Sequence, residues 1–394
     1  MLNSLNSFAT DEASLHIPVR AAENKVFVAA ANKVGPLVPE AMVDAISAAT
    51  GIPVEFLNGA GESQVVAPDG TVLARASRDR EEFVCADIDL QQADDKSRPD
   101  GTDVFSSRRP AIYGPISADP CAQCLPAMSG SAEVTAAVAQ LRVNDLEHAL
   151  AAVRDAVAGG AELVVLPPLV GDIADLDAAA DHGEQVLSAL ARICGEAHVG
   201  TAIVRRSAAG DYRYCAVLVS RQGLVHEQAQ VHASSRYAFS AGAAGFSACD
   251  LPLGRVAVLA SDDSIYPETF RLLAMAGVEI ALVPLSPLED WELATGLLER
   301  SAENRINLLV APDTLDHGPG FITALQTDFT VMTEWQERAF DGLLSQPEWY
   351  RCDNRAGVML QTIRPANGAH KVVSRNTDLL ADRPWDLATA ITRV

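Results

Sequence analysis

The chain has 394 residues, of which 48% are hydrophobic and 21% charged, a composition typical of a globular protein with one large domain or two smaller ones. Lys and Arg number 30 against 52 Asp and Glu, so the formal net charge is −22 at pH 7. Such an acidic surface repels phosphate backbones and anionic lipid, and we therefore expect no nucleic-acid partner and no membrane partner.

The cysteine pattern and the N-terminus indicate the compartment. Seven scattered cysteines, an odd number without a dense framework, suit a reducing environment. The first residues lack the cationic region and apolar core of a signal peptide, and no apolar run reaches the roughly 18 residues of a membrane helix. We expect a cytoplasmic protein.

The first segment, residues 1–113, has few predicted elements. We expect a helix over 14–24 and strands over 26–31, 63–67 and 82–87, followed by a polar stretch at 91–101. Pro68-Asp69-Gly70 has the composition of a hairpin turn. Three strands are too few to close a two-sheet sandwich.

Residues 114–131 are rich in proline, glycine and small residues and are predicted to be a linker. They contain Cys121 and Cys124, a lone CxxC pair that would be only half of a zinc site. The eight histidines show no metal-binding spacing either. We therefore predict no metal and no cofactor.

From residue 134 onward, strands and helices alternate. Strands are expected over 134–141, 163–167, 200–205, 214–220, 256–260, 280–283 and 308–311, and helices over 144–158, 183–197, 268–276 and 293–304. Alternation at this spacing favours a layered α/β fold.

The chain also contains an internal repeat. Residues 20–32, RAAENKVFVAAAN, match residues 300–312, RSAENRINLLVAP. Each copy is a helix end, a polar corner and a buried strand, so the match indicates a duplicated domain. The alternative is coincidence between two common helix–strand junctions.

These motifs resemble the nitrilase (carbon–nitrogen hydrolase) superfamily. Residues 133–311 are similar to the front two thirds of such a domain, with markers at 136–140, 160–167 and 259–268. Residues 12–90 are similar to the back part of another copy, with markers at 20–24, 29–35, 68–70 and 85–89. The resemblance implies a four-layer α-β-β-α sandwich over 132–394, preceded by a partial copy over 1–113 and the linker 114–131.

The resemblance also implies a Glu–Lys–Cys catalytic set. The Cys attacks an amide or nitrile carbon, the Lys stabilises the charged intermediate and the Glu moves protons. In the complete copy the corresponding positions hold Pro168, Gln230 and Ser261. The partial copy begins after the point where its Cys would lie, so no intact catalytic set is expected.

Other residues near these positions have two interpretations. Ser261 could act as a nucleophile only with a base, for which His232 is the candidate. Asp263, Pro267 and Glu268 match the family pattern and are expected to fix the turn and cap the next helix. Candidate pocket residues are Asp263, Glu268 and Asn32, where Asn32 and the nearby Gly35 are equally well explained as a structural turn.

Three functions remain open. The chain is part of an amidohydrolase whose catalytic residues come from a partner chain or missing N-terminal sequence, or a non-catalytic binding or regulatory protein, or a hydrolase that uses Ser261. A half sandwich leaves a sheet edge and an apolar face uncovered. We therefore expect a homo-oligomer or a nitrilase-like partner subunit, and a small-molecule substrate or ligand that is an amide, a nitrile or a carbamoyl compound.

Overall fold

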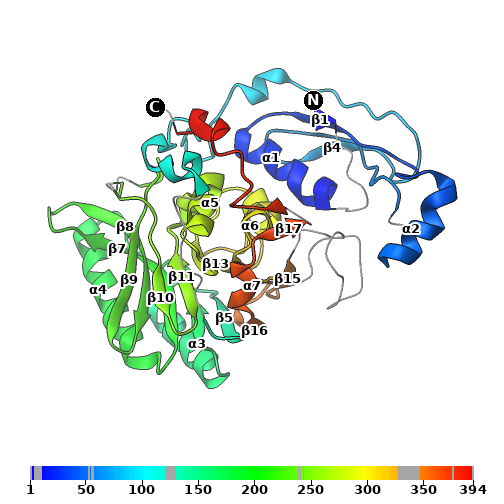
Figure 1. The fold of residues 1–394 in the computed structure, drawn as a ribbon. Coiled ribbons are helices and arrows are strands. Elements are labelled where there is room, and N and C mark those ends of the chain that lie inside the picture. Colours follow the sequence, from blue (N-terminus) through cyan, green and yellow to red (C-terminus); the bar gives the residue numbers. More distant parts are fainter. Residues whose placement is uncertain are drawn as a thin grey trace.

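The computed structural model describes residues 2–3, 11–51, 54, 57–120, 130–237, 239, 241–242, 244–326, 347–374 and 377–392. Their strands form two six-stranded sheets, a separate four-stranded sheet and a small two-stranded sheet. The two large sheets stack face to face between two helix layers, and the four-stranded sheet lies at one end of the molecule (Figure 1). One complete α-β-β-α sandwich and one partial copy are therefore present, as the sequence predicted.

The front sheet of the complete sandwich has the order β16-β5-β6-β7-β8-β9. Its strands are β5 (Val134–Gln140), β6 (Leu163–Val165), β7 (His198–Arg206), β8 (Tyr212–Ser220), β9 (Gly223–Ala229) and β16 (Gly357–Ile363). Helices α3 (Leu146–Ala158) and α4 (Leu176–Ile193) cover its outer face. Asp145 and Asp175 begin these helices, because their carboxylates accept hydrogen bonds from first-turn amides.

The back sheet has the order β10-β11-β12-β13-β14-β15. Its strands are β10 (Cys249–Leu251), β11 (Gly254–Val258), β12 (Ile280–Leu285), β13 (Asn307–Pro312), β14 (Phe321–Ala324) and β15 (Glu348–Arg351). Its outer face carries α5 (Pro267–Met275) and α6 (Leu297–Asn304), the latter preceded by the π-helical turn η9 (Glu292–Gly296). Buried aliphatic side chains of both sheets form the core between them.

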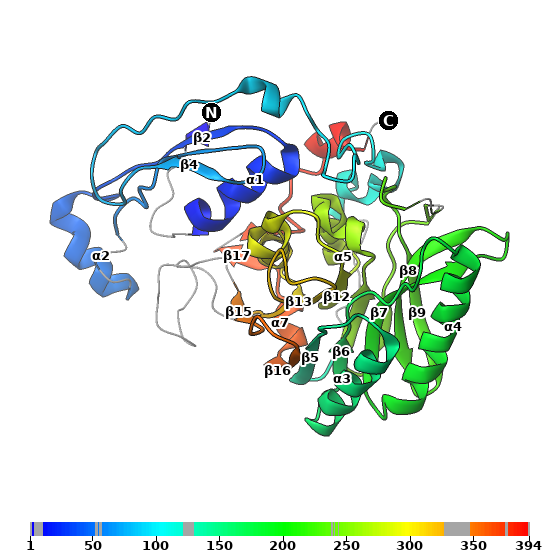
Figure 2. The same ribbon diagram turned by 180° about the vertical axis from the view of Figure 1, so that it is seen from behind.

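The partial copy is the sheet β1-β2-β3-β4, with strands β1 (Leu2–Asn3), β2 (Val28–Ala31), β3 (Gln64–Val66) and β4 (Val72–Arg75). Helix α1 (Ile17–Asn24), preceded by the π-helical turn η1 (Glu12–His16), packs on one face of this sheet. The other side of α1 packs on α6 and its surroundings, so α1 lies between the small sheet and the complete sandwich (Figure 2). Helix α2 (Val43–Thr50) lies in the connection from β2 to β3.

The sequence repeat has a structural counterpart. Both η1–α1 and η9–α6 are followed by a non-glycine residue in the left-handed region, Lys25 (φ 48°) and Arg305 (φ 51°), and then by a strand. Arg20 pairs with Glu303, and Arg300 pairs with Glu23. Reciprocal contacts between positions 280 residues apart are those of a local twofold axis between α1 and α6.

Most predicted elements were confirmed, with boundary shifts: the helix expected over 183–197 begins at Leu176. Pro68-Asp69-Gly70 is the turn between β3 and β4, where Gly70 has φ +85° and the Asp69 carboxylate accepts the Thr71 amide at 2.9 Å. The strands β4, β9, β10, β14, β15 and β16 were not predicted.

The strand predicted over 82–87 was wrong. These residues are extended, but within the described chain residues 81–88 make no backbone–backbone hydrogen bond. A strand exists only with a neighbour to pair with, and the described residues provide none here.

The predicted linker 114–131 is described up to residue 120 and from residue 130. Gly114–Ser117 forms a 3₁₀ turn (η6), and Ile116 is buried against Leu272 of α5, so this part is anchored. Cys121 and Cys124 lie outside the described residues. In the described residues, no helix is both long and apolar enough to cross a membrane, and no cluster of His, Cys, Asp and Glu is suited to a metal ion.

Candidate active site

The three positions assigned to the catalytic set all follow strands of the complete sandwich. Pro168 follows β6, Gln230 follows β9 and Ser261 follows β11. The strands β6 and β9 run in the same direction, because β7 is parallel to β6 and the steps from β7 to β8 to β9 are both antiparallel. Pro168 and Gln230 therefore lie at the same edge of the front sheet.

An aromatic cluster connects this edge to the turn that contains Ser261. Tyr214 stacks on Tyr237 with ring centroids 5.5 Å apart, and Phe239 packs against both rings. The same cluster includes Ala260, next to Ser261, and Val170, two residues after Pro168. The backbone amide of Gln230 donates to the carbonyl of Tyr214 at 2.8 Å. The ends of β6, β9 and β11 thus meet around one aromatic cluster.

The side chains at the first two positions are unsuited to catalysis. Pro168 offers only its backbone carbonyl, which accepts a hydrogen bond from Asn144 at 2.7 Å. Gln230 carries no charge, and its amide nitrogen donates to the carbonyl of His232 at 2.8 Å. Neither residue can supply the proton-transferring carboxylate or the cation that a developing negative charge requires.

Ser261 is buried, with an exposed fraction of 1%. Its Oγ accepts a hydrogen bond from the amide of Ser286 at 2.8 Å and donates to the carbonyl of the same residue at 3.2 Å. The hydroxyl therefore acts as a bridge between the turn after β11 and the end of β12. A nucleophile must face a bound substrate, and this side chain faces the protein backbone.

His232 does not serve as a base for Ser261. Its Nδ1 lies 2.8 Å from Oδ1 of Asp263, and its Nε2 lies 2.7 Å from the hydroxyl of Tyr113. The ring is fully buried and stacks on Tyr266 with 3.8 Å between centroids. Both nitrogens are thus used in structural contacts, and the geometry does not support a Ser–His catalytic pair.

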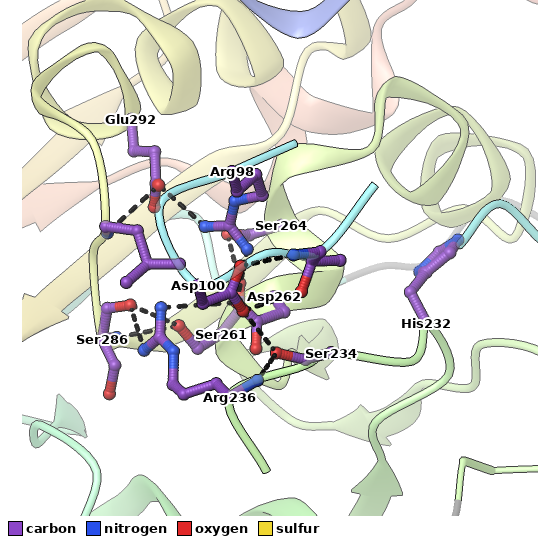
Figure 3. Close-up of polar contacts among 12 residues, drawn as sticks. Arg98, Asp100, His232, Ser234, Arg236, Ser261, Asp262, Ser264, Ser286 and Glu292 are labelled. Carbon is purple, nitrogen blue, oxygen red and sulfur yellow. Dashed lines mark hydrogen bonds and ion pairs between the residues drawn. The ribbon is translucent and has the colours of Figure 1, made fainter. Parts of the chain in front are cut away.

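A buried arginine from the first segment occupies the space beside this turn (Figure 3). Nη1 of Arg98 lies 2.7 Å from Oδ1 of Asp262, and its Nη2 lies 2.8 Å from Oε1 of Glu292. All three side chains are at most 3% exposed. Burial raises the pKa of Glu292, and the guanidinium of Arg98 opposes that rise by stabilising the carboxylate.

Further contacts hold the first segment over the turn. Ser234 donates to Asp100 at 3.1 Å, and the amide of Ser235 donates to the hydroxyl of Thr102 at 2.7 Å. Arg236 donates to the carbonyl of Ser286 at 2.7 Å and approaches Asp262 at 3.6 Å (Figure 3). The segment around Arg98 therefore closes the site from outside.

The three candidate pocket residues are not brought together. Asp263 is fully buried, and instead of capping α5 its carboxylate accepts the amides of Val231 and His232. Asn32 belongs to the small sheet, where its side-chain oxygen accepts the amide of Lys33 at 2.8 Å. Glu268 pairs with Arg108 and lines a pocket of about 260 Å³ between α1 and the start of α5.

Sequence reasoning missed Arg98, Arg236 and Glu292. Arg98 stands in a polar stretch without periodicity, and nothing local distinguishes it from a solvated residue. Glu292 stands 280 positions after Glu12, which is the same spacing as in the repeat. Extending the comparison of the two copies to these residues could have pointed to Glu292.

Comparison with known proteins identifies the architecture. A family model described as carbon–nitrogen hydrolase matches residues 2–97 and 135–312. The structure of a carbon–nitrogen hydrolase from Helicobacter pylori is similar at 15% identity and a TM-score of 0.53, over 66% of this chain and 99% of that chain. A search of curated proteins finds no match.

An amidase from Nesterenkonia sp., solved as a double mutant with acrylamide, is similar at 17% identity and a TM-score of 0.50, over 67% and 99% of the two chains. A single mutant of that amidase, described as a nitrilase-superfamily protein, is similar at 19% identity and a TM-score of 0.50, over 67% and 98%. At these identities the likeness concerns the fold.

Proposed function

Because the chain belongs to the carbon–nitrogen hydrolase family, we propose that it is one part of an amidohydrolase whose Glu–Lys–Cys set is supplied by a partner chain or by sequence preceding Met1. In this proposal residues 1–113 are the back part of the catalytic domain. Residues 132–394 are a second, catalytically silent copy that serves as a scaffold.

The observation that carries the proposal is the closure of the site that the family motifs assign to the described part of this chain. Ser261 bonds to the backbone of Ser286, and Arg98 fills the adjacent space with a buried ion-paired guanidinium. Restoring a substrate pocket would require removing Arg98, which would leave Asp262 and Glu292 buried without their common cation. We infer that catalysis takes place in the incomplete copy.

The substrate class follows from the same membership. The reaction is hydrolysis of a non-peptide C–N bond in a small amide, nitrile or carbamoyl compound. The Cys on the completing polypeptide would attack the carbon, with the Lys and the Glu beside it. This chain would contribute the loop after β2, around Asn32, to the border of that site.

A non-catalytic binding protein is the second candidate. The pocket of about 260 Å³ between α1 and the start of α5 favours it, because this pocket has apolar walls, including Tyr266 and Trp291, and a rim that carries Glu268 and Glu289. Such a pocket suits a small ligand without requiring any chemistry. The third candidate, a Ser261 hydrolase, lacks a base in the described residues.

The test begins with the DNA directly upstream of the codon for Met1. We expect an open reading frame that encodes Leu-Pro-Glu, a Lys and a Cys in that order. Its product, co-expressed with this chain, should co-purify and hydrolyse members of a panel of small amides and nitriles. Activity should be lost when that Cys is changed to Ala and retained with Ser261→Ala in this chain.

Two results would contradict the proposal. Turnover by this chain alone would show that its own site is open. A stable complex that carries the full Glu–Lys–Cys set but hydrolyses nothing in the panel would favour the binding-protein alternative, which ligand screening by thermal shift against the pocket near Trp291 would then pursue.

A further inference from the structure

One face of the small sheet is apolar and open. The register places Ala29 of β2 beside Val65 of β3, and Val65 beside Ala74 of β4, so the three side chains form one row across the sheet. This row points away from α1, which packs on the alternate residues Val28 and Val66. Ala29 is exposed, and Val65 and Ala74 are only half-buried.

The complete copy shows what covers the equivalent face. There the corresponding row is Leu309 of β13, Ile322 of β14 and Tyr350 of β15. Leu309, 280 positions after Ala29, is fully buried, as is Ile322. Both pack against the front sheet in the core between the two sheets. The small sheet is therefore a back sheet without its front sheet.

A single extended segment already lies where part of that front sheet would be. Residues 80–90, REEFVCADIDL, align with residues 355–365, RAGVMLQTIRP, which contain β16. The strand β16 pairs antiparallel with β5 along its whole length, whereas residues 81–88 pair with nothing described. Figure 1 shows this light-blue segment running along the outer side of the small sheet.

The side chains of this segment alternate as those of β16 do. Phe83 and Cys85 are exposed, Phe83 fully so, and they align with Val358 and Leu360, which pack on the helix layer of the front sheet. Phe83 is a large apolar side chain on an extended segment that has no backbone–backbone hydrogen bond to any described residue, as is typical of an edge strand without its neighbour.

We propose that the open face of β2–β4 and the segment 81–88 together bind the front half of a nitrilase-like domain on another polypeptide. The first strand of that front half would pair antiparallel with residues 82–88, as β5 pairs with β16, and its sheet would cover the row of Ala29, Val65 and Ala74. The proposal rests on the proposed function only in expecting this partner to carry the catalytic set.

A second copy of this chain is a poor occupant. Its own first strand, β5, is already paired with β16 from Val134 to Gln140, and its front sheet already covers its own back sheet. The occupant must instead have a free first strand. Ala29 and Ala74 are smaller than Leu309 and Tyr350, so the partner's sheet must approach closer or carry bulkier inward side chains.

The experiment supplies a front half of known fold. Leu2 of β1 pairs with Ala30 of β2 as Val283 of β12 pairs with Val310 of β13, which stands 280 positions after Ala30. Residues 132–282 can therefore be fused directly before Leu2 of the full chain. In this fusion we expect amide hydrogen exchange at residues 82–88, and alkylation of Cys85 by a maleimide, to slow at least tenfold relative to the chain alone. The fused residues lack the catalytic set, so the readout is independent of activity.

Proline substitution provides a matched control. Val84→Pro combined with Ala86→Pro should leave the melting temperature of the chain alone unchanged, because these residues make no described backbone–backbone hydrogen bond. The same pair should lower the melting temperature of the fusion. Met359→Pro combined with Gln361→Pro, at the aligned positions of β16, should lower the melting temperature of the chain alone.

Two results would overturn the proposal. The first is slow amide exchange at residues 82–88 in the chain alone, since the surface would then be covered already. Protection of these amides that appears only when light scattering shows a dimer counts as the same result. The second is unchanged fast exchange in a fusion whose added residues are themselves protected. Either result leaves the upstream reading-frame test of the proposed function unaffected.

Discussion

Arg98 and Asp262 are in direct contact, with Nη1 2.7 Å from Oδ1, although 164 residues separate them along the chain. Asp262 is the immediate neighbour of Ser261, so this ion pair fixes a residue of the first segment beside the position that we assign to the nucleophile of the family. The ion pair therefore closes the space beside Ser261 and joins the first segment to the complete sandwich.

Replacing Arg98 should therefore lower the free energy of unfolding. Arg98→Ala leaves Glu292 buried without its cation and Asp262 with only the more distant Arg236, and we expect a loss of about 3–5 kcal/mol in the free energy of unfolding by urea. Arg80→Ala, at an exposed ion pair, is the control and should change stability by less than about 1 kcal/mol. A similar loss of unfolding free energy in both variants would argue against a stabilising role of the buried Arg98 ion pairs.

The purified chain should show no amidase or nitrilase turnover, because Pro168, Gln230 and Ser261 replace the catalytic set. Ammonia release from a panel of small amides and nitriles measures this. Activity that survives Ser261→Ala would refute the assignment of the silent site, whereas activity lost in Ser261→Ala would promote the Ser-nucleophile alternative.

Ser261→Cys alone should not create an enzyme. The new thiol would have a pKa no lower than the roughly 8.5 of free Cys, since the Lys position holds Gln230 and burial at position 261 disfavours the thiolate. We also expect it to resist iodoacetamide in the folded state, because position 261 is 1% exposed, while the exposed Cys85 is alkylated in the same sample. Peptide mass spectrometry distinguishes the two sites.

The triple change Pro168→Glu, Gln230→Lys and Ser261→Cys is the minimum that could restore catalysis. We expect it to remain inactive while Arg98 fills the adjacent space. Thioester formation in the Ser261→Cys single variant would show that the site has been assigned to the wrong residues.

The contact between His16 of η1 and Glu299 of α6 predicts a pH dependence of stability. Burial alone would lower the pKa of His16, but Asp11 and Glu299 outweigh it and raise the pKa from 6.5 to about 10. A raised folded-state pKa means that the stabilisation is fully present below pH 6.5 and is lost as the pH rises through about 10.

The His16→Gln variant isolates this effect. We expect it to be less stable than the wild type by on the order of 2 kcal/mol at pH 6, with the difference shrinking steadily towards pH 10. Urea unfolding at several pH values measures it, and His148→Gln on the surface of α3 controls for the loss of a histidine. A difference that stays constant across this range would rule out the proposed ion pair.

Expressed alone, the chain should not be a protease-resistant monomer. Trypsin should cut first after the exposed Arg78 or Arg80, next to the unpaired segment, while the complete sandwich resists. Size exclusion with light scattering measures whether the uncut chain also self-associates, for which a second copy is a poor occupant of the open sheet face. A compact, resistant monomer of 41.7 kDa would mean that the first segment is completed within this chain.

The layered fold could be predicted from sequence because its signals are local. Short apolar runs such as 163–167 and amphipathic stretches such as 144–158 each specify an element within a few residues. The repeat of residues 20–32 at 300–312 revealed the duplication for the same reason. The assignment of Pro168, Gln230 and Ser261 to the catalytic positions rests on motif order and residue identity, which are also properties of the sequence.

The tertiary structure alone decided what surrounds those positions. The contacts of Arg98 with Asp262 and Glu292 span 164 and 194 residues, and no local pattern encodes such distances. The segment at 82–87 has the alternation of a strand, yet it is unpaired, because strand formation depends on a neighbour and not on the segment itself. The same dependence leaves Phe83 in solvent, at the edge where we propose that a partner strand pairs.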